Sequence, residues 1–236
     1  MGGEGKERDI QTGKSLEKEG SAGKDEGLAG FSPEEVRFLS QRAVQRELSG
    51  GEAVFVQGEE IRAMFLLETG RVKLSKVLED GSEILLDIRG PGDFIGEYLF
   101  SEREPVYPAS AWCMQRARFS EFTPQLFEEI VREQPNIGLH IIKRLGQQIG
   151  SLTRRVSSMS IPRLEDRLYQ VLADLAREHG VRSEQGYSIP FSITHEELSF
   201  LVGAHRVSIT KALRALKDSG YILQKGRIMI FPELSA

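Results

Sequence analysis

Apolar and polar positions follow two successive periods along this chain, the first typical of strands and the second typical of helices. Between about residues 43 and 122, short apolar runs at 53–56, 63–67, 71–77 and 83–88 are separated by glycine-containing turns. Short strands with glycine at the corners predict a small antiparallel barrel or a double-sheet roll. The periodicity alone leaves other all-β modules open.

From Pro124 to about residue 159 the apolar positions recur every three or four residues, which predicts helix. A narrow apolar seam within this stretch favours a two-stranded coiled coil that joins two copies of the chain. Packing against a broad core is the alternative, because Gly146 and Gly150 weaken an isolated helix. The segment 160–162 ends in proline and is the predicted hinge. The predicted dimer residues are Ile142, Leu145, Ile149, Leu152, Val156 and Met159.

Residues 194–220 are predicted to form a helix-turn-helix. Thr194 and Glu197 have the spacing of a capping box at a helix start, and Gly203 lies where the chain turns into a second helix. The second helix has an apolar face, and its opposite face carries hydrogen-bonding and cationic side chains. The apolar face consists of Ile209, Ala212, Leu213 and Leu216, and the polar face consists of Arg206, Ser208, Thr210, Lys211 and Arg214.

Such a pair of helices could also be an ordinary helical hairpin with a solvated polar face. Residues 221–231 alternate apolar and basic types around Lys225-Gly226, as expected for the hairpin of a winged helix. This wing favours a DNA-binding function for the C-terminal part of the chain.

The chain divides into four predicted parts and an α+β fold. Residues 1–30 contain eight glycines, twelve charged residues and almost no apolar ones, so we expect a disordered tail. Residues 31–135 form the predicted antiparallel β-roll sensor domain, which opens with a short helix at Ser32-Pro33. Residues 136–160 are the dimerisation helix, and residues 161–236 are the winged helix-turn-helix domain.

The formal net charge of −4 is unevenly distributed along the chain. Residues 137–236 hold 14 Lys and Arg against 9 Asp and Glu, which gives +5, whereas residues 1–136 hold 17 against 26, which gives −9. A basic C-terminal part attached to an acidic N-terminal part is consistent with a DNA-binding module.

Several classes of protein are disfavoured by what the sequence lacks. No apolar run reaches the roughly 20 residues of a membrane helix, and no signal peptide is present, so we expect a cytoplasmic protein without membrane association. Cys113 is the only cysteine, and the four histidines lack metal-ligand spacing, so we expect neither a metal nor another cofactor. Common catalytic motifs are also missing, and we do not expect an enzyme.

The order of roll, long helix, hinge and winged helix is similar to that of the CRP/FNR superfamily of bacterial transcription regulators. The resemblance covers about residues 32–232. Segments 58–61, 79–83 and 203–207 look closest to the branch that controls halorespiration genes in response to chlorinated aromatics. The matching motifs are Gln57-Gly58-Glu59, Thr69-Gly70-Arg71-Val72, Gly92-Asp93-Phe94-Ile95-Gly96-Glu97 and Ser110-Ala111-Trp112.

The resemblance implies a homodimer whose small-molecule effector lies between the roll and the long helix and re-aims two DNA-reading heads. Cyclic-nucleotide-binding members have a Gly-Glu pair followed by Arg-Ser, but this chain has Ala109-Ser110 at the second position. A buried phosphate without its arginine is strongly disfavoured. The base-contacting polar pair of the long helix is also only partly matched, by Leu152 and Thr153. We therefore expect an effector other than cyclic AMP.

The remaining side chains near the implied site suit a small aromatic or carboxylate ligand. Several of them could instead be core residues, and an effector-independent regulator is the alternative function. The halorespiration branch has a ligand-contacting lysine where this chain has Glu97, which argues against a chlorophenol. The candidate effector residues are Gly96, Glu97, Tyr98, Tyr107, Ser110, His140 and Arg144.

The resemblance also assigns roles in DNA binding. Arg206, Val207 and Lys211 correspond to base-reading positions, and Val207 can contact a thymine methyl group but cannot accept a hydrogen bond. Two-fold symmetry predicts a pseudo-palindromic operator with half-site centres about 34 Å apart. Relatives contact RNA polymerase through the region of residues 180–190. The candidate DNA-binding residues are Thr194, Arg206, Val207, Ser208, Thr210, Lys211, Arg214, Lys225 and Arg227.

Overall fold

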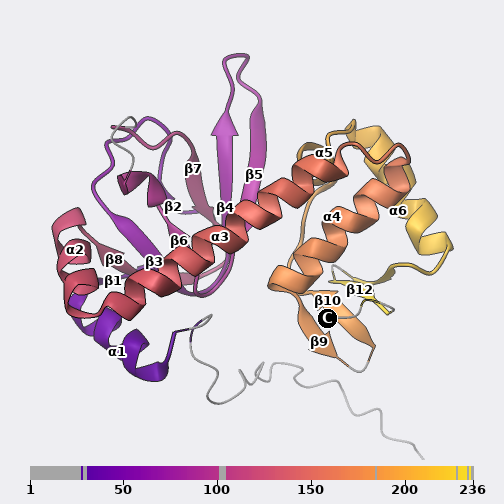
Figure 1. The fold of residues 1–236 in the computed structure, drawn as a ribbon. Helices are drawn as coiled ribbons and strands as arrows, with labels where there is room; N and C mark the ends of the chain where they lie inside the picture. Colours follow the sequence, from indigo (N-terminus) through magenta and orange to yellow (C-terminus); the bar gives the residue numbers. More distant parts are fainter. Residues whose placement is uncertain are drawn as a thin grey trace, which may run out of the picture.

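The computed structural model describes residues 28, 31–100, 105–183, 185–226, 228–232 and 234. A β-roll and a smaller C-terminal domain are joined by one long helix, α3 (Figure 1). The predicted N-terminal tail lies outside the described residues, apart from Leu28. The helices are α1 (Pro33–Arg42), the short η2 (Glu97–Phe100), α2 (Pro124–Glu133), α3 (Pro135–Ser158), α4 (Leu164–His179), α5 (His195–Val202) and α6 (Arg206–Asp218).

The β-roll consists of two four-stranded sheets, as the short strands predicted. One sheet has the order β1-β8-β3-β6 and the other has the order β2-β7-β4-β5, with every pair of neighbours antiparallel. The strands are β1 (Val44–Leu48), β2 (Ala53–Phe55), β3 (Met64–Thr69), β4 (Val72–Val77), β5 (Glu83–Arg89), β6 (Phe94–Ile95), β7 (Ser110–Cys113) and β8 (Ala117–Phe122).

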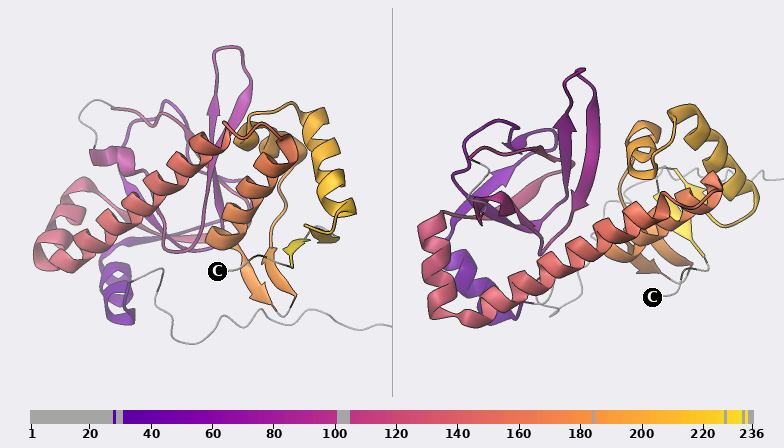
Figure 2. Two further views of the ribbon diagram at one scale, coloured as in Figure 1. Left: turned by 45° about the vertical axis from the view of Figure 1, so that its right-hand side comes forward. Right: turned by 45° about the horizontal axis from the view of Figure 1, so that its top comes forward.

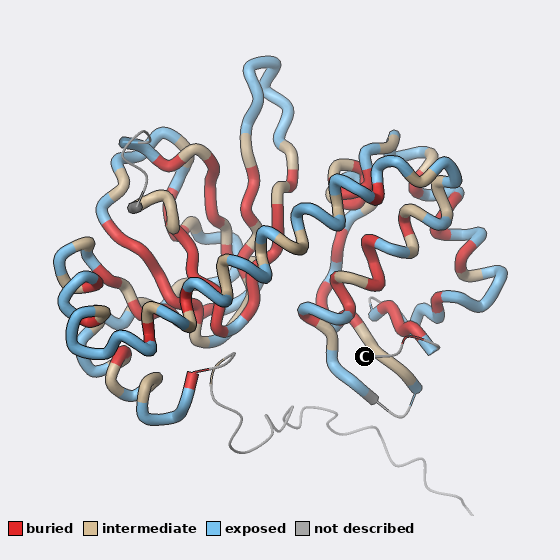
Figure 3. The backbone as a smooth tube through the Cα atoms, viewed as in Figure 1, coloured by how far each residue is buried: buried red, intermediate tan, exposed pale blue. Residues whose placement is uncertain are grey.

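Two apolar cores stabilise the roll and the helices on it. Phe65, Leu74 and Phe119 belong to the core between the two sheets, where alternate side chains point inward from each strand. Phe94 and Ile137 belong to a second core, in which α1, α2 and the start of α3 cover one sheet. Figure 3 shows these buried segments along the strands, while the far half of α3 is largely exposed. The roll is thereby fixed to the first turns of α3.

The helical region after Pro124 contains two helices, and the second begins at Pro135, next to the start at residue 136 predicted for the dimerisation helix. Pro135 is the first residue of α3, and Gln134 before it has non-helical backbone angles, with φ −130° and ψ 77°. Proline disfavours helical geometry at the residue before it, which separates α2 from α3.

The C-terminal domain packs three helices against a four-stranded antiparallel sheet with the order β11-β12-β10-β9. The predicted wing is present as β11 and β12, joined at Gly226, whose φ is +62°. The hairpin of β9 and β10 was not predicted, because the Gly-Ser-Gln composition of this segment carries no clear strand period. The strands are β9 (Val181–Ser183), β10 (Gly186–Ile189), β11 (Leu223–Lys225) and β12 (Ile228–Phe231).

The C-terminal domain is docked against the roll as well as tethered by α3 (Figure 2). Leu85 and Ile88 of β5 are buried in the same apolar core as the helices of the C-terminal domain. Lys73 of β4 also forms an ion pair of 3.5 Å with Glu197 of α5. A change at the roll can therefore reach the helix-turn-helix through direct contact.

Candidate nucleic-acid interface and sensor cavity

The helix-turn-helix forms as the sequence predicted. Thr194 and Glu197 make both hydrogen bonds of the capping box at the start of α5. Gly203 adopts left-handed angles, φ 67° and ψ 51°, at the turn into α6, a conformation that costs other residues energy. The predicted apolar face of α6 is buried, namely Ile209, Ala212, Leu213 and Leu216.

The opposite face of α6 is exposed to solvent and carries the predicted DNA contacts. Arg206, Val207 and Lys211 are all exposed, and Val207 has 68% of its surface accessible. Within the described residues, neither Arg206 nor Lys211 has an ion-pair partner, so both cations are available to phosphates or base edges. With most of its side chain in solvent, Val207 is available for contact with a binding partner.

Two of the predicted contacts are engaged by the protein itself. The Thr210 hydroxyl donates to the main-chain oxygen of Arg206 at 3.1 Å and lies 2.9 Å from His195 Nδ1. Thr194 uses its side chain to cap α5. Their structural role is therefore to fix the helices, while a DNA-binding role for each stays a prediction.

The other predicted DNA contacts flank this face. Ser208 is half-buried, and Arg214 is exposed and lies 3.8 Å from Asp218. Lys225 of the wing donates to the side-chain oxygen of Gln185 at 2.8 Å. Arg227 lies outside the described residues.

Sequence reasoning missed the N-terminus of α6 itself. His205 is the N-cap residue, but its side chain makes no capping hydrogen bond. The first amides of α6 are therefore free to bind an anion, which the helix dipole favours. The sequence could have indicated these free amides, because position 205 holds none of the usual N-cap residues Ser, Thr, Asp and Asn.

The seam of α3 is an apolar stripe without a covering element in one copy of the chain. Five of the six predicted dimer residues are exposed, and Leu145 is half-buried against the roll. Leu139, which is also exposed, extends the stripe by one turn. Burying such a stripe against a second copy would remove several large aliphatic side chains from water. The exposed five are Ile142, Ile149, Leu152, Val156 and Met159.

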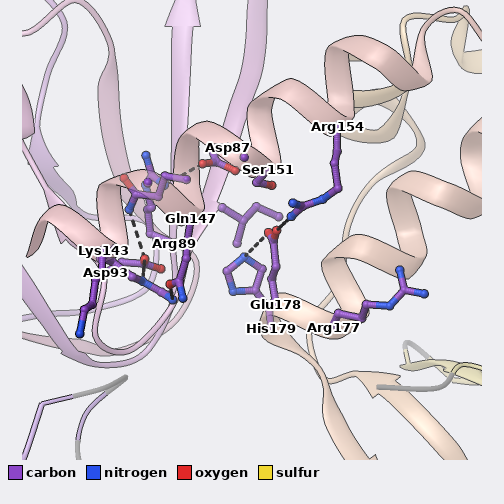
Figure 4. Close-up of a pocket in the computed structure, with 15 residues that line it drawn as sticks. Asp87, Arg89, Asp93, Lys143, Gln147, Ser151, Arg154, Arg177, Glu178 and His179 are labelled. Carbon is purple, nitrogen blue, oxygen red and sulfur yellow. Dashed lines mark hydrogen bonds and ion pairs between the residues drawn. The ribbon is translucent and has the colours of Figure 1, made fainter. Parts of the chain in front are cut away.

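A cavity of about 740 Å³ lies between the end of β5, the middle of α3 and the end of α4 (Figure 4). Its walls therefore come from the roll, the long helix and the C-terminal domain. Arg89 and Asp93 line it from the roll, Arg144 lines it from α3, and His179 lines it from α4. Volumes of this size are typical of small-molecule sites.

A network of buried ion pairs stabilises the wall of this cavity that the roll forms. Arg89 lies 2.9 Å from Asp87 and 3.2 Å from Glu97, and Arg155 of α3 lies 2.8 Å from Asp87. Burial favours the neutral form of Arg89, but the carboxylates of Asp87, Glu97 and Asp93 outweigh it and raise the pKa of the guanidinium. Arg89 is therefore charged, as a buried ion needs close partners to be.

Asp93 ties the turn after β5 to α3. It accepts hydrogen bonds from Arg144 Nε at 2.8 Å and from the amide of Gly90 at 2.7 Å. On the opposite wall, His179 is buried, and this burial is the main reason that its pKa is lowered to about 4. At neutral pH the cavity thus contains a neutral imidazole beside several fixed charges.

Comparison with known proteins matches both halves of the chain. Residues 45–134 match the model of the cyclic nucleotide-binding domain, and residues 166–232 match that of the Crp-like helix-turn-helix domain. The chain belongs to the CRP/FNR family of transcription regulators. It is a DNA-binding regulator with an effector-binding domain, and its family is not one of enzymes.

Curated relatives and solved structures have similar lengths and folds. A CRP-like cAMP-activated global transcriptional regulator of Mycobacterium tuberculosis is 24% identical over 204 residues, covering 86% of this chain and 91% of the relative. The cyclic AMP receptor protein of Thermus thermophilus is 26% identical over 193 residues, covering 82% and 86%. The structure of CprK complexed with OCPA is 26% identical, with a TM-score of 0.64, covering 86% of this chain and 91% of that one.

Gly96-Glu97 and Ala109-Ser110, the two pairs that the resemblance pointed to, are held by contacts within the roll. Ala109, where the resemblance led us to expect arginine, is buried directly before β7, and the Ser110 hydroxyl accepts a hydrogen bond of 3.0 Å from the amide of Gln57. Gly96 has a φ of +88°, and a Cβ there would lie 3.0 Å from the Ala63 oxygen, so close packing requires glycine. Glu97 begins η2 and faces Arg89.

The structure does not bring the seven predicted effector residues together. Of these, only Arg144 lines the cavity, and Glu97 reaches the network beside it through Arg89. Tyr107 is buried in the roll, where it stacks on Phe55 and donates to the Ala63 oxygen at 2.7 Å. Tyr98 lies on η2 and does not line the cavity itself, but it is one of the groups that raise the pKa of the lining Arg89.

His140 lies on α3 one turn before Arg144, and it does not line this cavity. It packs edge-on against Phe31, and its Nδ1 lies 3.5 Å from Glu35 of α1. These contacts with α1 position the ring, although Nδ1 is buried and has no hydrogen-bond partner among the described residues. Its role as an effector residue stays a prediction.

Cys113 is buried, and burial is the main reason that its pKa is raised to about 11. The protonated thiol is a poor nucleophile and metal ligand. Among the described residues, no helix combines the length and apolar character that a bilayer-spanning segment needs.

Proposed function

We propose that this chain is a homodimeric, effector-responsive transcription regulator that binds a pseudo-palindromic operator and contacts RNA polymerase. The observation that carries the proposal is the pairing of two exposed surfaces on one chain. One is the apolar stripe of α3, and the other is the cationic face of α6.

The stripe supports the dimer because it spans nearly the whole of α3. Its residues alternate by three and four, the spacing with which two helices interlock. A two-fold dimer presents two copies of α6, and successive major grooves on one face of DNA are about 34 Å apart. The N-terminus of α6, with its free amides and Arg206, is the part we expect at the groove.

The effector we propose is a small molecule other than cyclic AMP. The relatives described as cAMP-activated are 24–27% identical to this chain. Here the arginine position holds buried Ala109, and Ser110 already bonds to the main chain, so the phosphate would lack both partners. The departure at Glu97, which pairs with Arg89, also argues against a chlorophenol.

An effector-independent regulator is the second candidate, and one observation favours it. The hydroxyl groups of Tyr107 and Ser110 are satisfied inside the roll, as they would be in a roll that serves only as a scaffold. Such a protein would bind its operator tightly after purification without any additive.

The proposal is tested by titrating binding to random-sequence duplex DNA against salt concentration. A DNA-binding dimer gives a steep linear fall of log affinity with log salt, because phosphate contacts release counterions. Binding that does not change with salt would contradict the proposed function and favour a protein partner for the winged helix.

A further inference from the structure

The cavity between the roll, α3 and α4 is strongly polar. Its lining carries five arginine and lysine side chains against three aspartate and glutamate side chains, and Ile88 is its only large apolar residue. His179 adds no charge near neutral pH, because burial lowers its pKa to about 4. Three neighbours belong to the same group of charges, because Glu97 pairs with Arg89, Asp174 pairs with Arg177 and Arg155 pairs with Asp87. The whole group keeps one positive charge in excess, which an anionic occupant would balance.

Arg89 has one donor that nothing in the described chain satisfies. Its side chain is 7% exposed, and it uses its two terminal nitrogens for Asp87 and Glu97. Its Nε is buried without a hydrogen-bond partner. Buried arginine nitrogens are rarely left unpaired, because each costs free energy, and this one belongs to a side chain that lines the cavity (Figure 4).

Lys143 supplies a second cation at the cavity. It is exposed on α3, and within the described residues it forms no ion pair. The other cations of the lining differ from it, since Arg144 is paired with Asp93 and Arg154 with Glu178. Lys143 is thus free to pair with a bound anion.

The two glycines of α3 give the cavity its room. Gly146 and Gly150 both line it, and a Cβ at Gly146 would meet no atom within 4 Å. A Cβ at Gly150 would meet only the tip of the Arg154 side chain. Glycine weakens a helix relative to alanine. Because Gly146 is exposed and Gly150 is half-buried, Gly150 is the position where a side chain would take up cavity space.

From these observations we infer that the cavity binds a small-molecule anion with acceptor oxygens for both Arg89 and Lys143, a phosphate monoester or a dicarboxylate, each of them a dianion near neutral pH. This inference rests on the proposed function and names the class of its effector. Because the walls come from both domains, the bound dianion would stabilise one arrangement of the roll and the C-terminal domain over others. The polar lining also differs from the aromatic site that the sequence predicted.

The inference is tested by isothermal titration calorimetry on the full-length protein. Glucose 6-phosphate and glutarate are the two dianion probes, with glucose and acetate as neutral and monoanionic controls at matched ionic strength. We expect at least one dianion to bind with one site per chain and neither control to bind. The probe that binds identifies the source of the acidic groups, whereas failure of both dianions overturns the inference.

Two pairs of variants locate the site. Lys143→Met should weaken dianion binding at least fivefold, whereas Lys76→Met, on β4 away from the cavity, should leave it unchanged. Gly150→Leu should abolish binding by filling the cavity, whereas Gly150→Ala should retain part of it. Dianion binding that survives both Lys143→Met and Gly150→Leu places the site elsewhere and overturns the inference.

Binding of the same proteins to low-salt duplex DNA, without additive, separates this inference from the proposed function. DNA binding without any dianion binding contradicts the ligand class alone. Dianion binding by a protein that never binds DNA contradicts the proposed function alone.

Discussion

The Arg71 guanidinium of the roll donates a hydrogen bond of 2.6 Å to the main-chain oxygen of His179, at the last turn of α4. The same guanidinium lies over the ring of Phe191, 4.7 Å from its centroid. A cation at a helix C-terminus interacts favourably with the helix dipole. Burial lowers the pKa of Arg71, but arginine still remains charged at neutral pH. This contact joins the sensor domain to the DNA-binding domain.

We expect Arg71→Met to destabilise the protein by about 1–3 kcal/mol, because the substitution leaves a helix-end carbonyl without its donor. Urea unfolding of the dimer would measure the change. Arg62→Met is the matched control, since Arg62 is exposed and pairs only with its neighbour Glu60. Equal stability of the two variants would show that Arg71 does not contribute to the docking.

His179 should make stability depend on pH. Its pKa of about 4 in the folded protein lies below the ordinary value of 6.5, mainly because of burial. Between these two values the imidazole is protonated in the unfolded chain but neutral in the folded one. The free energy of unfolding therefore falls as the pH drops from about 6.5 to 4. From above pH 6.5 down to 4, the loss from this one group is on the order of 3 kcal/mol.

The measurement is the free energy of unfolding at pH 7 and pH 4.5, for the native protein and for His179→Phe. The variant should lose less stability than the native protein over this range, because it lacks the imidazole. Some loss should remain, because Asp87 and Asp93, the carboxylates that face residue 179, are present in both proteins. Identical losses of stability in the two proteins would mean that folding does not lower the pKa of His179.

Ile149→Asp should convert the dimer into folded monomers. Ile149 lies in the middle of the α3 stripe, and the two-fold dimer would bury a carboxylate opposite its own copy. Sedimentation at micromolar concentration would measure the mass, and circular dichroism would show that the fold is kept. Ser157→Asp, exposed on the same helix but off the stripe, should remain a dimer.

Arg206→Ala should cost about 1–3 kcal/mol of operator affinity and relax the preference for one base. Arg206 is exposed at the first turn of α6, where helix-turn-helix proteins reach base edges. Arg116→Ala, at an exposed position on the roll, is the control. A variant that binds more weakly but prefers the same sequence would make Arg206 a phosphate contact only.

The elements were predictable where the chain carries a local signal. The capping box of Thr194 and Glu197 and the left-handed turn at Gly203 each depend on residues a few positions apart, and both form as expected. The seam of α3 was predictable for the same reason.

The sensor cavity was much less predictable. The pair of Arg89 with Glu97 and that of Arg144 with Asp93 depend on how the turn after β5 meets α3, which no local pattern encodes. The sequence indicated that the usual arginine is missing at Ala109. It did not indicate that Arg89 approaches the Gly96-Glu97 corner from another strand.

The central claim is that a dimer inserts two α6 helices into successive major grooves of DNA. Selection of bound duplexes from a random pool by the full-length protein, with and without glucose 6-phosphate and glutarate, tests it most directly. The account predicts enrichment of an inverted repeat whose half-site centres are about 34 Å apart. Enrichment of a single unrepeated site, or of no sequence at low ionic strength, would contradict it.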